Sequence, residues 1–288
     1  MKNKIYFILG QTASGKTAFA TKLAKELKTA ELINCDSRQT YKYLDIITGK
    51  IDNPKDIPVH MVDLVDPKDY YSGYDYALET RKKIDDLLSQ GITPIVVGGT
   101  GMYAYLLTYI NPNIPKNRFQ VPTDLKGVTI YNLQKELTEK YPFIWNKMTD
   151  SDKKNKRRLA GALHRLTYGS SSLIDPKSDN NIANKYETEV TILLHKDQTS
   201  LNEKLKLRVK SRLSMGAIEE CKILLTKGYS EKDPGLATIG YKSIFKYLRE
   251  ELTKEEMIEE WIIKERQYSK RQKTYLTKYF PEGKIIYV

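Results

Sequence analysis

A short segment near the N-terminus, Gly10 to Thr17, has the residue types and spacing of a phosphate-binding loop. It reads GQTASGKT and matches G-x-x-x-x-G-K-[ST], in which successive backbone N–H groups surround phosphates at a helix N-terminus. Lys16 would supply positive charge, and Thr17 would supply a hydroxyl for Mg²⁺. A chance glycine turn is disfavoured because the match lies between an apolar run and a helical pattern. We expect a di- or triphosphate ligand, while nucleotide hydrolysis, phosphoryl transfer and displacement of pyrophosphate all stay open.

Asp36 is the next residue whose position suggests chemistry. It follows the short apolar run Glu31 to Asn34 and precedes Ser37, Arg38 and Gln39. In parallel sheets, ligands bind beyond the carboxyl ends of the strands, so this carboxylate would face the phosphates. Three roles stay open from the residue type alone: Mg²⁺ ligand, proton acceptor, or cap of the following turn.

The elements that must position these residues are strands and helices in alternation. Apolar runs at Ile5 to Leu9, Glu31 to Asn34 and Ile92 to Val97 each adjoin segments with helical spacing. This alternation is typical of parallel strands with crossover helices. We therefore predict an α/β fold with a P-loop NTPase-like core, in which helices flank a parallel sheet. Polar sequence follows each run, including Gly98 to Gly101 after the third, so three strand ends should converge on one crevice.

The chain changes character between residues 111 and 168. This stretch is rich in proline and asparagine as far as about Pro122, and is then charged with weak apolar periodicity. We interpret residues 111–168 as a smaller, mainly helical insertion in a catalytic core formed by residues 1–110 and 169–288. In the second part of the core we predict a strand at Thr188 to Leu194 and helical structure from Leu201 to Leu225. A last long helix, from about Lys254 to Tyr279, places basic residues among tyrosines.

Composition is compatible with a polyanionic partner and equally with a basic cytosolic surface that binds none. The 288 residues carry a formal net charge of +12, with 21 tyrosines among 48 lysines and arginines. The two cysteines have no disulfide or metal-site spacing, which favours a reducing compartment. Neither a membrane span nor a signal peptide is evident in the sequence. We expect a cytoplasmic protein, monomeric, with no membrane association and no obligate protein partner.

Beyond the phosphate loop, the chain resembles tRNA dimethylallyltransferases, the enzymes that prenylate an adenosine beside the anticodon. Their phosphate loop typically reads GPTASGKT, and residues 34–50, NCDSRQTYKYLDIITGK, resemble the segment after their second strand. PVHMVDLVDP (58–67) resembles PHHLIDxxDP, and TPIVVGGTGMY (93–103) resembles PxxVGGTGLY. NKRRLAGAL (155–163) resembles DPQRIxRAL, and KLKLRVKSRLSMG (204–216) resembles RIxxRVxxMxxxG. ATIGYKS (237–243) and RQYSKRQKTY (266–275) resemble IGYKQ and TRQYAKRQxTW, so the likeness covers nearly the whole chain in the family's order.

The sequence departs from the family pattern at several positions. Gly161 replaces the second Arg of the insertion motif, and Lys204 replaces the Arg that opens the 204–216 motif. Tyr275 replaces the Trp of the last motif, and Glu265 replaces the Thr that precedes Arg266. The insertion is also shorter than is typical of the family, so the docking of tRNA is the inference most affected.

The resemblance implies a prenyl transfer. A dimethylallyl group would move from dimethylallyl diphosphate to the exocyclic amine of the adenosine 3′ to the anticodon, releasing pyrophosphate. Asp36 would accept the amine proton, Lys16 and Arg208 would neutralise the leaving group, Thr17 would bind Mg²⁺, and Thr100 would contact the target nucleotide. The anticodon stem-loop of tRNA and dimethylallyl diphosphate are the implied partners. The base must leave its stack before it can react.

The implied binding residues fall into two sets. The diphosphate would be bound by Gly10, Gln11, Thr12, Ala13, Ser14, Gly15, Lys16, Thr17 and Arg208. The tRNA would be bound by Asp36, Ser37, Arg38, Gln39, Thr100, Arg157, Arg158, Lys270 and Arg271, with other basic residues of the insertion (Lys153, Lys154, Lys156 and Arg165) gripping its phosphates.

Two alternatives fit the phosphate loop by itself. A small-molecule or nucleoside kinase would transfer the terminal phosphoryl group of ATP. An RNA-binding GTPase-like switch would use the loop to sense a nucleotide, although the sequence has no N-K-x-D signature for guanine.

Overall fold

The computed structural model describes residues 3–50, 54, 56–110, 127–167 and 181–288. The chain divides into two compact units, one formed by Met1–Tyr109 with Asn181–Val288 and the other by Ile110–Asn180. The sequence predicts these units as 1–110 with 169–288, and 111–168. Its proline- and asparagine-rich stretch, from Asn111 to about Pro122, lies outside the described residues.

The first unit is built on a parallel sheet. Its six strands lie in the order β3-β2-β4-β1-β5-β6, and every neighbouring pair is parallel. They are β1 (Lys4–Gly10), β2 (Ala30–Asn34), β3 (Val59–His60), β4 (Thr93–Gly98), β5 (Glu187–Leu194) and β6 (Lys284–Tyr287). The four strands predicted from apolar runs are confirmed as β1, β2, β4 and β5. The sequence did not indicate the two edge strands, which are short and only partly buried.

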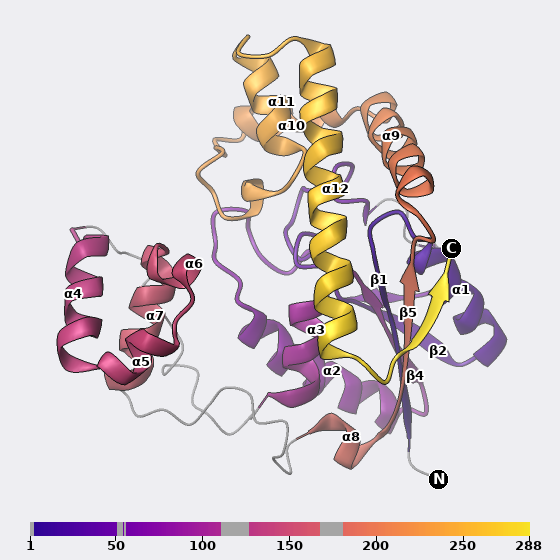
Figure 1. The fold of residues 1–288 in the computed structure, drawn as a ribbon. Helices are drawn as coiled ribbons and strands as arrows, with labels where there is room; N and C mark the ends of the chain where they lie inside the picture. The colour runs from indigo at the N-terminus through magenta and orange to yellow at the C-terminus, as the bar shows by residue number, and fades with distance from the viewer. Residues whose placement is uncertain (1–2, 51–53, 55, 111–126, 168–180) are drawn as a thin grey trace. The chain divides into compact units, whose positions relative to one another are not determined.

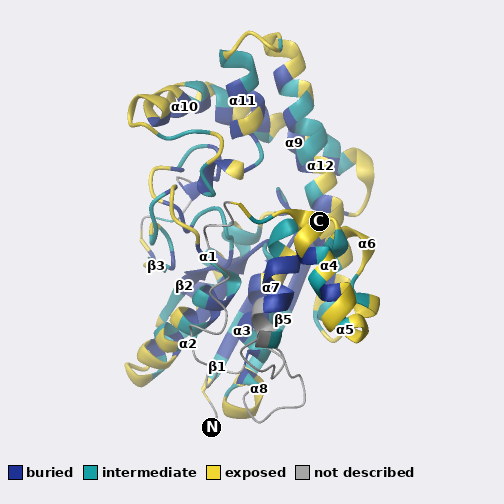
Figure 2. Ribbon diagram, turned by 90° about the vertical axis from the view of Figure 1, so that its left-hand side faces the viewer, coloured by how far each residue is buried: buried dark blue, intermediate teal, exposed yellow. Residues whose placement is uncertain are grey.

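Alternation along β1 divides its side chains between two helical layers. Ile5, Phe7 and Leu9 point to the face covered by α2 (Gly73–Ser89), α3 (Gly101–Tyr109) and the end of α12 (Lys254–Tyr279). Ile8 points to the opposite face and packs with Ala20 and Ala24 of α1 (Lys16–Leu27). The central strands are accordingly buried on both sides, as Figure 2 shows. The predicted α/β fold is confirmed.

Helices extend the first unit beyond the carboxyl ends of the strands (Figure 1). There α9 (Gln198–Ser214), α10 (Ala217–Thr226), α11 (Tyr241–Leu248) and the first half of α12 enclose a second core around Trp261 and Tyr241. The sequence predicts helical structure from Leu201 to Leu225, and this is confirmed as two helices, α9 and α10. The structure breaks it at Gly216, whose φ of 100° suits glycine and ends one helix before the next begins. Two short elements, α8 (Ile182–Lys185) and a 3₁₀ turn (Gly235–Ala237), complete this unit.

The second unit is helical in its described part. It contains α4 (Ile130–Lys140), α5 (Pro142–Lys147), α6 (Asp150–Lys153) and α7 (Lys156–Thr167). Leu133, Leu137, Leu159 and Leu163 form its own small core. The first turn of α7 carries Lys156, Arg157 and Arg158, all of which are at least partly exposed.

Candidate active site

The phosphate loop joins the end of β1 to the start of α1. Gly15 precedes α1 with φ of 78°, a left-handed conformation that L side chains rarely adopt. Gly10 lies so close to β5 that a Cβ there would be 2.3 Å from the carbonyl oxygen of Leu193. The ammonium of Lys16 folds back on the loop and donates to the carbonyl oxygen of Gln11 at 2.5 Å. Both glycines are therefore required by the shape of the loop.

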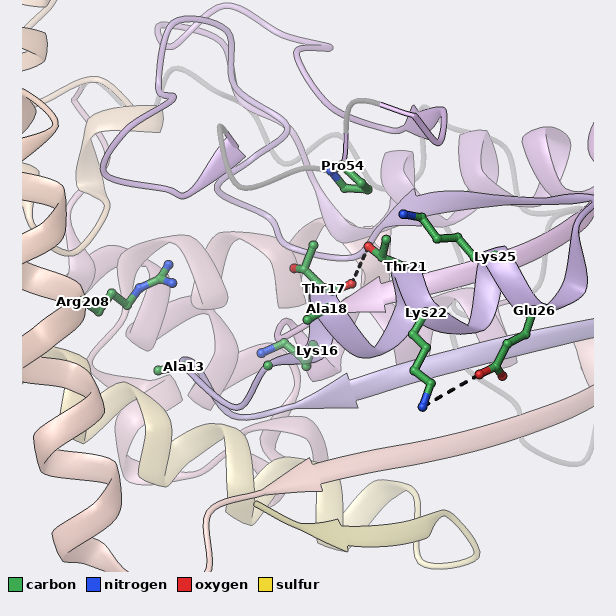
Figure 3. Close-up of a pocket in the computed structure, with 11 residues that line it drawn as sticks. Ala13, Lys16, Thr17, Ala18, Thr21, Lys22, Lys25, Glu26, Pro54 and Arg208 are labelled. Atoms are coloured by element: carbon green, nitrogen blue, oxygen red, sulfur yellow. Dashed lines mark hydrogen bonds and ion pairs between the residues drawn. The ribbon is translucent and has the colours of Figure 1, made fainter.

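A cavity of about 890 Å³ opens on the loop and runs along α1. Figure 3 shows Lys16 and Thr17 at the start of α1 and Arg208 reaching toward them from α9. Backbone N–H groups at a helix N-terminus together with two cationic side chains form a site for an anion. Helix α9, far away in the sequence, thus completes the site that the loop begins.

Two smaller cavities adjoin the first and share Arg208 with it. One, of about 90 Å³, lies between the loop and the ends of β2 and β4, with Leu32, Val59 and Val97 among its apolar lining residues. The other, of about 280 Å³, lies against α12 and is lined in part by Thr238 and Glu265. Both are lined by Asp36. Asp36 is therefore shared by a cavity that Lys16 and Thr17 of the phosphate loop also line and by the cavity against α12.

The charges of the site act on one another. The pKa of Lys16 is lowered to about 8, because burial, with a further contribution from the positive charge of Arg208, outweighs the opposite effect of Asp36 and Glu265. Burial likewise raises the pKa of the Glu265 carboxyl, against the effect of Arg208. Two cationic and two acidic side chains thus interact, with Glu265 buried and the other three partly exposed.

Asp36 is held by a turn that its own side chain caps. Its Oδ1 accepts the backbone N–H of Arg38 at 2.9 Å, and its own N–H donates to Oδ1 of Asn34 at 2.9 Å. Asn34 in turn donates to the carbonyl oxygens of Asp36 and Met61, both at 3.0 Å. The capping role that the sequence left open is therefore present, and the carboxylate lines both smaller cavities as well.

Thr100 lies directly behind this turn. Its hydroxyl oxygen accepts the backbone N–H of Ser37 at 3.0 Å, and Tyr268 of α12 forms a hydrogen bond with the same side chain. Thr100 is not among the lining residues of the three cavities described above. Burial raises the pKa of the Tyr268 hydroxyl, so this phenol stays protonated.

The residues expected to bind RNA lie in both units. Arg38 lines the cavity against α12 and donates to the carbonyl oxygen of Pro234 at 3.3 Å, while Arg271 lines the same cavity. Gln39 lines the smallest cavity and donates to the carbonyl oxygen of Thr48 at 3.1 Å. Lys270 is exposed on α12.

In the second unit, Arg158 is exposed and forms an ion pair with Asp152, and Arg157 is partly exposed beside it. Lys153, Lys154 and Lys156 also retain exposure, whereas the side chain of Arg165 is outside the described set.

Several residues of the site were not predicted from the sequence to belong to it, although Glu265 was noted as a departure from the family pattern. Glu265, Tyr268 and Gln272 line it from one face of α12, with spacings of three and four residues that place them on adjacent turns. Thr48 lines both smaller cavities. His195, directly after β5, forms a hydrogen bond with the carbonyl oxygen of Thr12 in the phosphate loop. The helical spacing was visible in the sequence, but nothing in it showed which face of α12 meets the phosphate loop.

Two searches of the described residues gave negative findings. They contain no cluster of three His, Cys, Asp or Glu side chains that is able to hold a metal ion. Among the same residues, no helix has the length and apolar character needed to cross a membrane.

Comparisons with known proteins agree with one another. The sequence pattern of the family described as IPP transferase matches residues 39–279, and that of isopentenyl transferase matches residues 3–56. A tRNA dimethylallyltransferase of Leuconostoc mesenteroides is 31% identical over 283 residues, which cover 97% of this chain and 91% of the relative. A tRNA dimethylallyltransferase 1 of Parabacteroides distasonis is 34% identical, with coverage of 93% and 86%.

Solved structures with a similar fold include a tRNA Δ2-isopentenylpyrophosphate transferase of Staphylococcus epidermidis. Its TM-score is 0.68 at 25% identity, covering 100% of this chain and 93% of that one. A eukaryotic dimethylallyltransferase acting on tRNA has a TM-score of 0.75 at 24% identity, covering 99% and 73%, and shows the likeness of fold. The P-loop NTPase-like core predicted from the sequence is confirmed.

Proposed function

The chain belongs to the tRNA dimethylallyltransferase family, and from this premise we propose that it transfers a dimethylallyl group from dimethylallyl diphosphate to tRNA. The acceptor is the exocyclic amine of the adenosine 3′ to the anticodon, and pyrophosphate is released. One observation carries the proposal. Asp36 lines both a cavity that Lys16 and Thr17 of the phosphate loop also line and a second cavity against α12, so donor and acceptor can approach the same carboxylate.

The donor binds with its diphosphate in the loop. Backbone N–H groups of Gly10 to Thr17 surround the phosphates, and Lys16 and Arg208 face them from opposite sides (Figure 3). These charges stabilise the diphosphate most strongly as it leaves, when negative charge builds up on the bridging oxygen.

The Thr17 hydroxyl fits a Mg²⁺ ion that is shared with the substrate. Mg²⁺ prefers oxygen ligands and is commonly bound by one or two protein oxygens together with substrate phosphates and water, rather than by a cage of carboxylates. Thr17 lines the loop cavity at the start of α1, where such an ion would meet the diphosphate. When bound, the ion would supply further positive charge to the leaving group.

The acceptor amine attacks from the side of Asp36. The amine nitrogen forms a bond to the allylic carbon while the bond from that carbon to the bridging oxygen breaks, and its electron pair leaves with pyrophosphate. The nitrogen becomes strongly acidic as carbon attaches, so a positioned carboxylate is able to accept its proton. The turn held by Asn34, Ser37 and Thr100 fixes the carboxylate for this step.

The tRNA reaches this point with its target base turned out of the anticodon stack. The nucleotides around the target base are held by residues that line the two smaller cavities or lie on α12, namely Arg38, Gln39, Lys270 and Arg271. Thr100 supports the turn that carries Asp36. The basic residues of the second unit, Arg157 and Arg158 among them, bind backbone phosphates.

Asp36→Asn tests the proposal. An asparagine retains an oxygen that accepts the N–H of Arg38, so the turn should persist, but it does not take up a proton. We expect kcat for formation of prenylated adenosine to fall by about 100-fold or more, while tRNA affinity stays close to that of the native protein. Mass analysis of nucleosides from tRNA incubated with dimethylallyl diphosphate measures the product, and ATP in place of the donor is the control.

Product formation at the native rate would show that Asp36 is not the base. ATP-dependent phosphorylation of an acceptor, without prenyl transfer, would overturn the function itself.

A further inference from the structure

Two consecutive residues of the phosphate loop are bonded to two residues one turn apart on α12. The side-chain amide of Gln11 donates to the hydroxyl oxygen of Ser269 at 2.9 Å and to its carbonyl oxygen at 3.3 Å. The backbone N–H of Thr12 donates to Oε1 of Gln272 at 2.7 Å, and Gln272 donates to the carbonyl oxygen of Gly99 at 2.9 Å. Helix α12 therefore lies directly against the phosphate loop and is hydrogen-bonded to it.

Gln11 also joins the loop to the end of β5. Its Oε1 accepts the backbone N–H of His195 at 2.8 Å, and its own N–H donates to the carbonyl oxygen of Leu193 at 3.1 Å. The imidazole of His195 lies 2.9 Å from the carbonyl oxygen of Thr12, and burial lowers its pKa, so the ring is neutral and its Nε2–H donates. One glutamine thus connects β1, β5 and α12.

These groups are shielded from water. Gln11 is 3% exposed and Ser269 is 0% exposed, so water does not replace a bond that either one loses. Removing one partner leaves the other as a buried polar group without its bond, which is more costly than removing both.

Both partners depart from the sequence pattern that the chain otherwise resembles. The family's loop reads GPTASGKT, with proline at the position of Gln11, and its last motif reads RQYAKRQ, with alanine at the position of Ser269. Proline and alanine have no side-chain donor or acceptor, so neither side of the Gln11–Ser269 bond exists in that pattern. The two departures lie 258 positions apart in sequence and meet in the structure.

We propose that Gln11 and Ser269 form a positioning pair that fixes the diphosphate site of this chain by bonding the phosphate loop to the C-terminal helix. The identity of the diphosphate as a prenyl donor rests on the proposed function. Gln11 acts on the diphosphate through Lys16, because the Lys16 ammonium donates to the carbonyl oxygen of Gln11 at 2.5 Å. A shift of Gln11 therefore moves the cation that faces the phosphates.

A double-mutant cycle with Gln11→Ala, Ser269→Ala and the double variant tests the pair. The first readout is calorimetric binding of inorganic pyrophosphate in the presence of Mg²⁺, which needs no turnover. We expect Gln11→Ala to weaken binding about 10-fold and Ser269→Ala about 3-fold, with the double variant no weaker than Gln11→Ala because the two share one bond. Thr277→Ala, at an exposed position of the same helix, is the control and should bind like the native protein.

Steady-state kinetics separate positioning from simple packing. KM for dimethylallyl diphosphate should rise with the pyrophosphate dissociation constant, whereas KM for tRNA should stay constant. Ser269→Ala removes a single oxygen from a helix and keeps the test available if the Gln11 variants do not fold.

Two results would contradict the proposed role of this pair. One is a double variant whose pyrophosphate affinity is weaker by the product of the two single effects, about 30-fold. The other is a lowered Tm of Ser269→Ala with unchanged pyrophosphate affinity. A third outcome is that the double-mutant cycle shows the expected coupling in pyrophosphate binding while the native protein transfers no prenyl group. In that case the proposed function is wrong and the positioning role of Gln11 and Ser269 is supported.

Discussion

At the scale of single residues, the site brings charges of both signs together at buried and partly buried positions. Lys16 shows the consequence most clearly, because burial lowers its pKa to about 8 although Asp36 and Glu265 lie nearby. The cation is thus costly to maintain in the free protein and is stabilised when a diphosphate binds. The side chain is poised to respond to its ligand.

The pH dependence of binding follows from this shift. A bound diphosphate favours charged Lys16, so its pKa in the complex exceeds the value of about 8 in the free protein. By linkage, the contribution of Lys16 to affinity is complete below pH 8 and is lost as pH rises above it, by up to about tenfold per pH unit. Calorimetry with inorganic pyrophosphate between about pH 7 and pH 9.5 measures the fall.

Pyrophosphate ionises over the same range, so the matched control is Lys16→Met. Ionisation of pyrophosphate affects both proteins equally, so the ratio of native to variant affinity at each pH reports the contribution of the Lys16 charge to binding. A ratio that is constant with pH would mean that the charge of Lys16 does not contribute to binding.

At the scale of elements, local patterns in the sequence predicted those parts of the fold that local chemistry determines. The run Ile5 to Leu9 has to be a buried strand, and its continuation GQTASGKT has to be a turn into a helix, so β1, the loop and α1 were predictable. The predicted range of the last long helix, Lys254 to Tyr279, is that of α12, and the structure adds a capping box of Thr253 and Glu256 at its start.

The contacts of α12 were not predictable in this way. That Ser269 meets Gln11, or that Glu265 lies beside Arg208, depends on how distant elements pack, and no short pattern encodes that. Gly216 was likewise visible as a glycine, but its φ of 100° became evident only from the way α9 and α10 pack.

A loop that lines the site is held in place by a helix from the second core. The carboxylate of Glu220 in α10 accepts the backbone N–H groups of Asp45 at 2.9 Å, Ile46 at 2.6 Å and Ile47 at 3.3 Å. It also accepts the hydroxyl of Tyr241 at 2.5 Å, and it is 8% exposed. Residues 45–47 lead directly to Thr48, which lines both smaller cavities.

Glu220→Ala should therefore reduce both stability and donor binding. Three buried or half-buried N–H groups and one hydroxyl would lose their acceptor, so we expect the free energy of unfolding to fall by about 2–4 kcal/mol. Denaturant unfolding measures this loss. Glu219→Ala, the next residue along, removes an exposed carboxylate that pairs with Lys222 at 3.2 Å, and should cost less than about 0.5 kcal/mol. Equal effects of the two substitutions would refute the anchoring role of Glu220.

At the scale of the whole molecule, the proposed recognition of tRNA is divided between two units of the chain. The first unit contains the candidate active site together with Arg38, Lys270 and Arg271. The second has a core of its own and basic residues on α7. A net charge of +12 gives both units attraction for a polyanion, so affinity should depend steeply on salt.

The double variant Arg157→Ala/Arg158→Ala tests the share of the second unit. Each phosphate contact that is lost removes the release of a counterion, so a log–log plot of tRNA affinity against salt should become less steep by about 1.5. Filter binding over a series of KCl concentrations measures the slope, and Lys82→Ala, at an exposed position of α2, is the control for a simple loss of charge. Pyrophosphate affinity should be unchanged, because the phosphate loop and Arg208 belong to the first unit. A slope equal to that of the native protein would exclude Arg157 and Arg158 from contact with tRNA phosphates and would assign the salt dependence to the first unit.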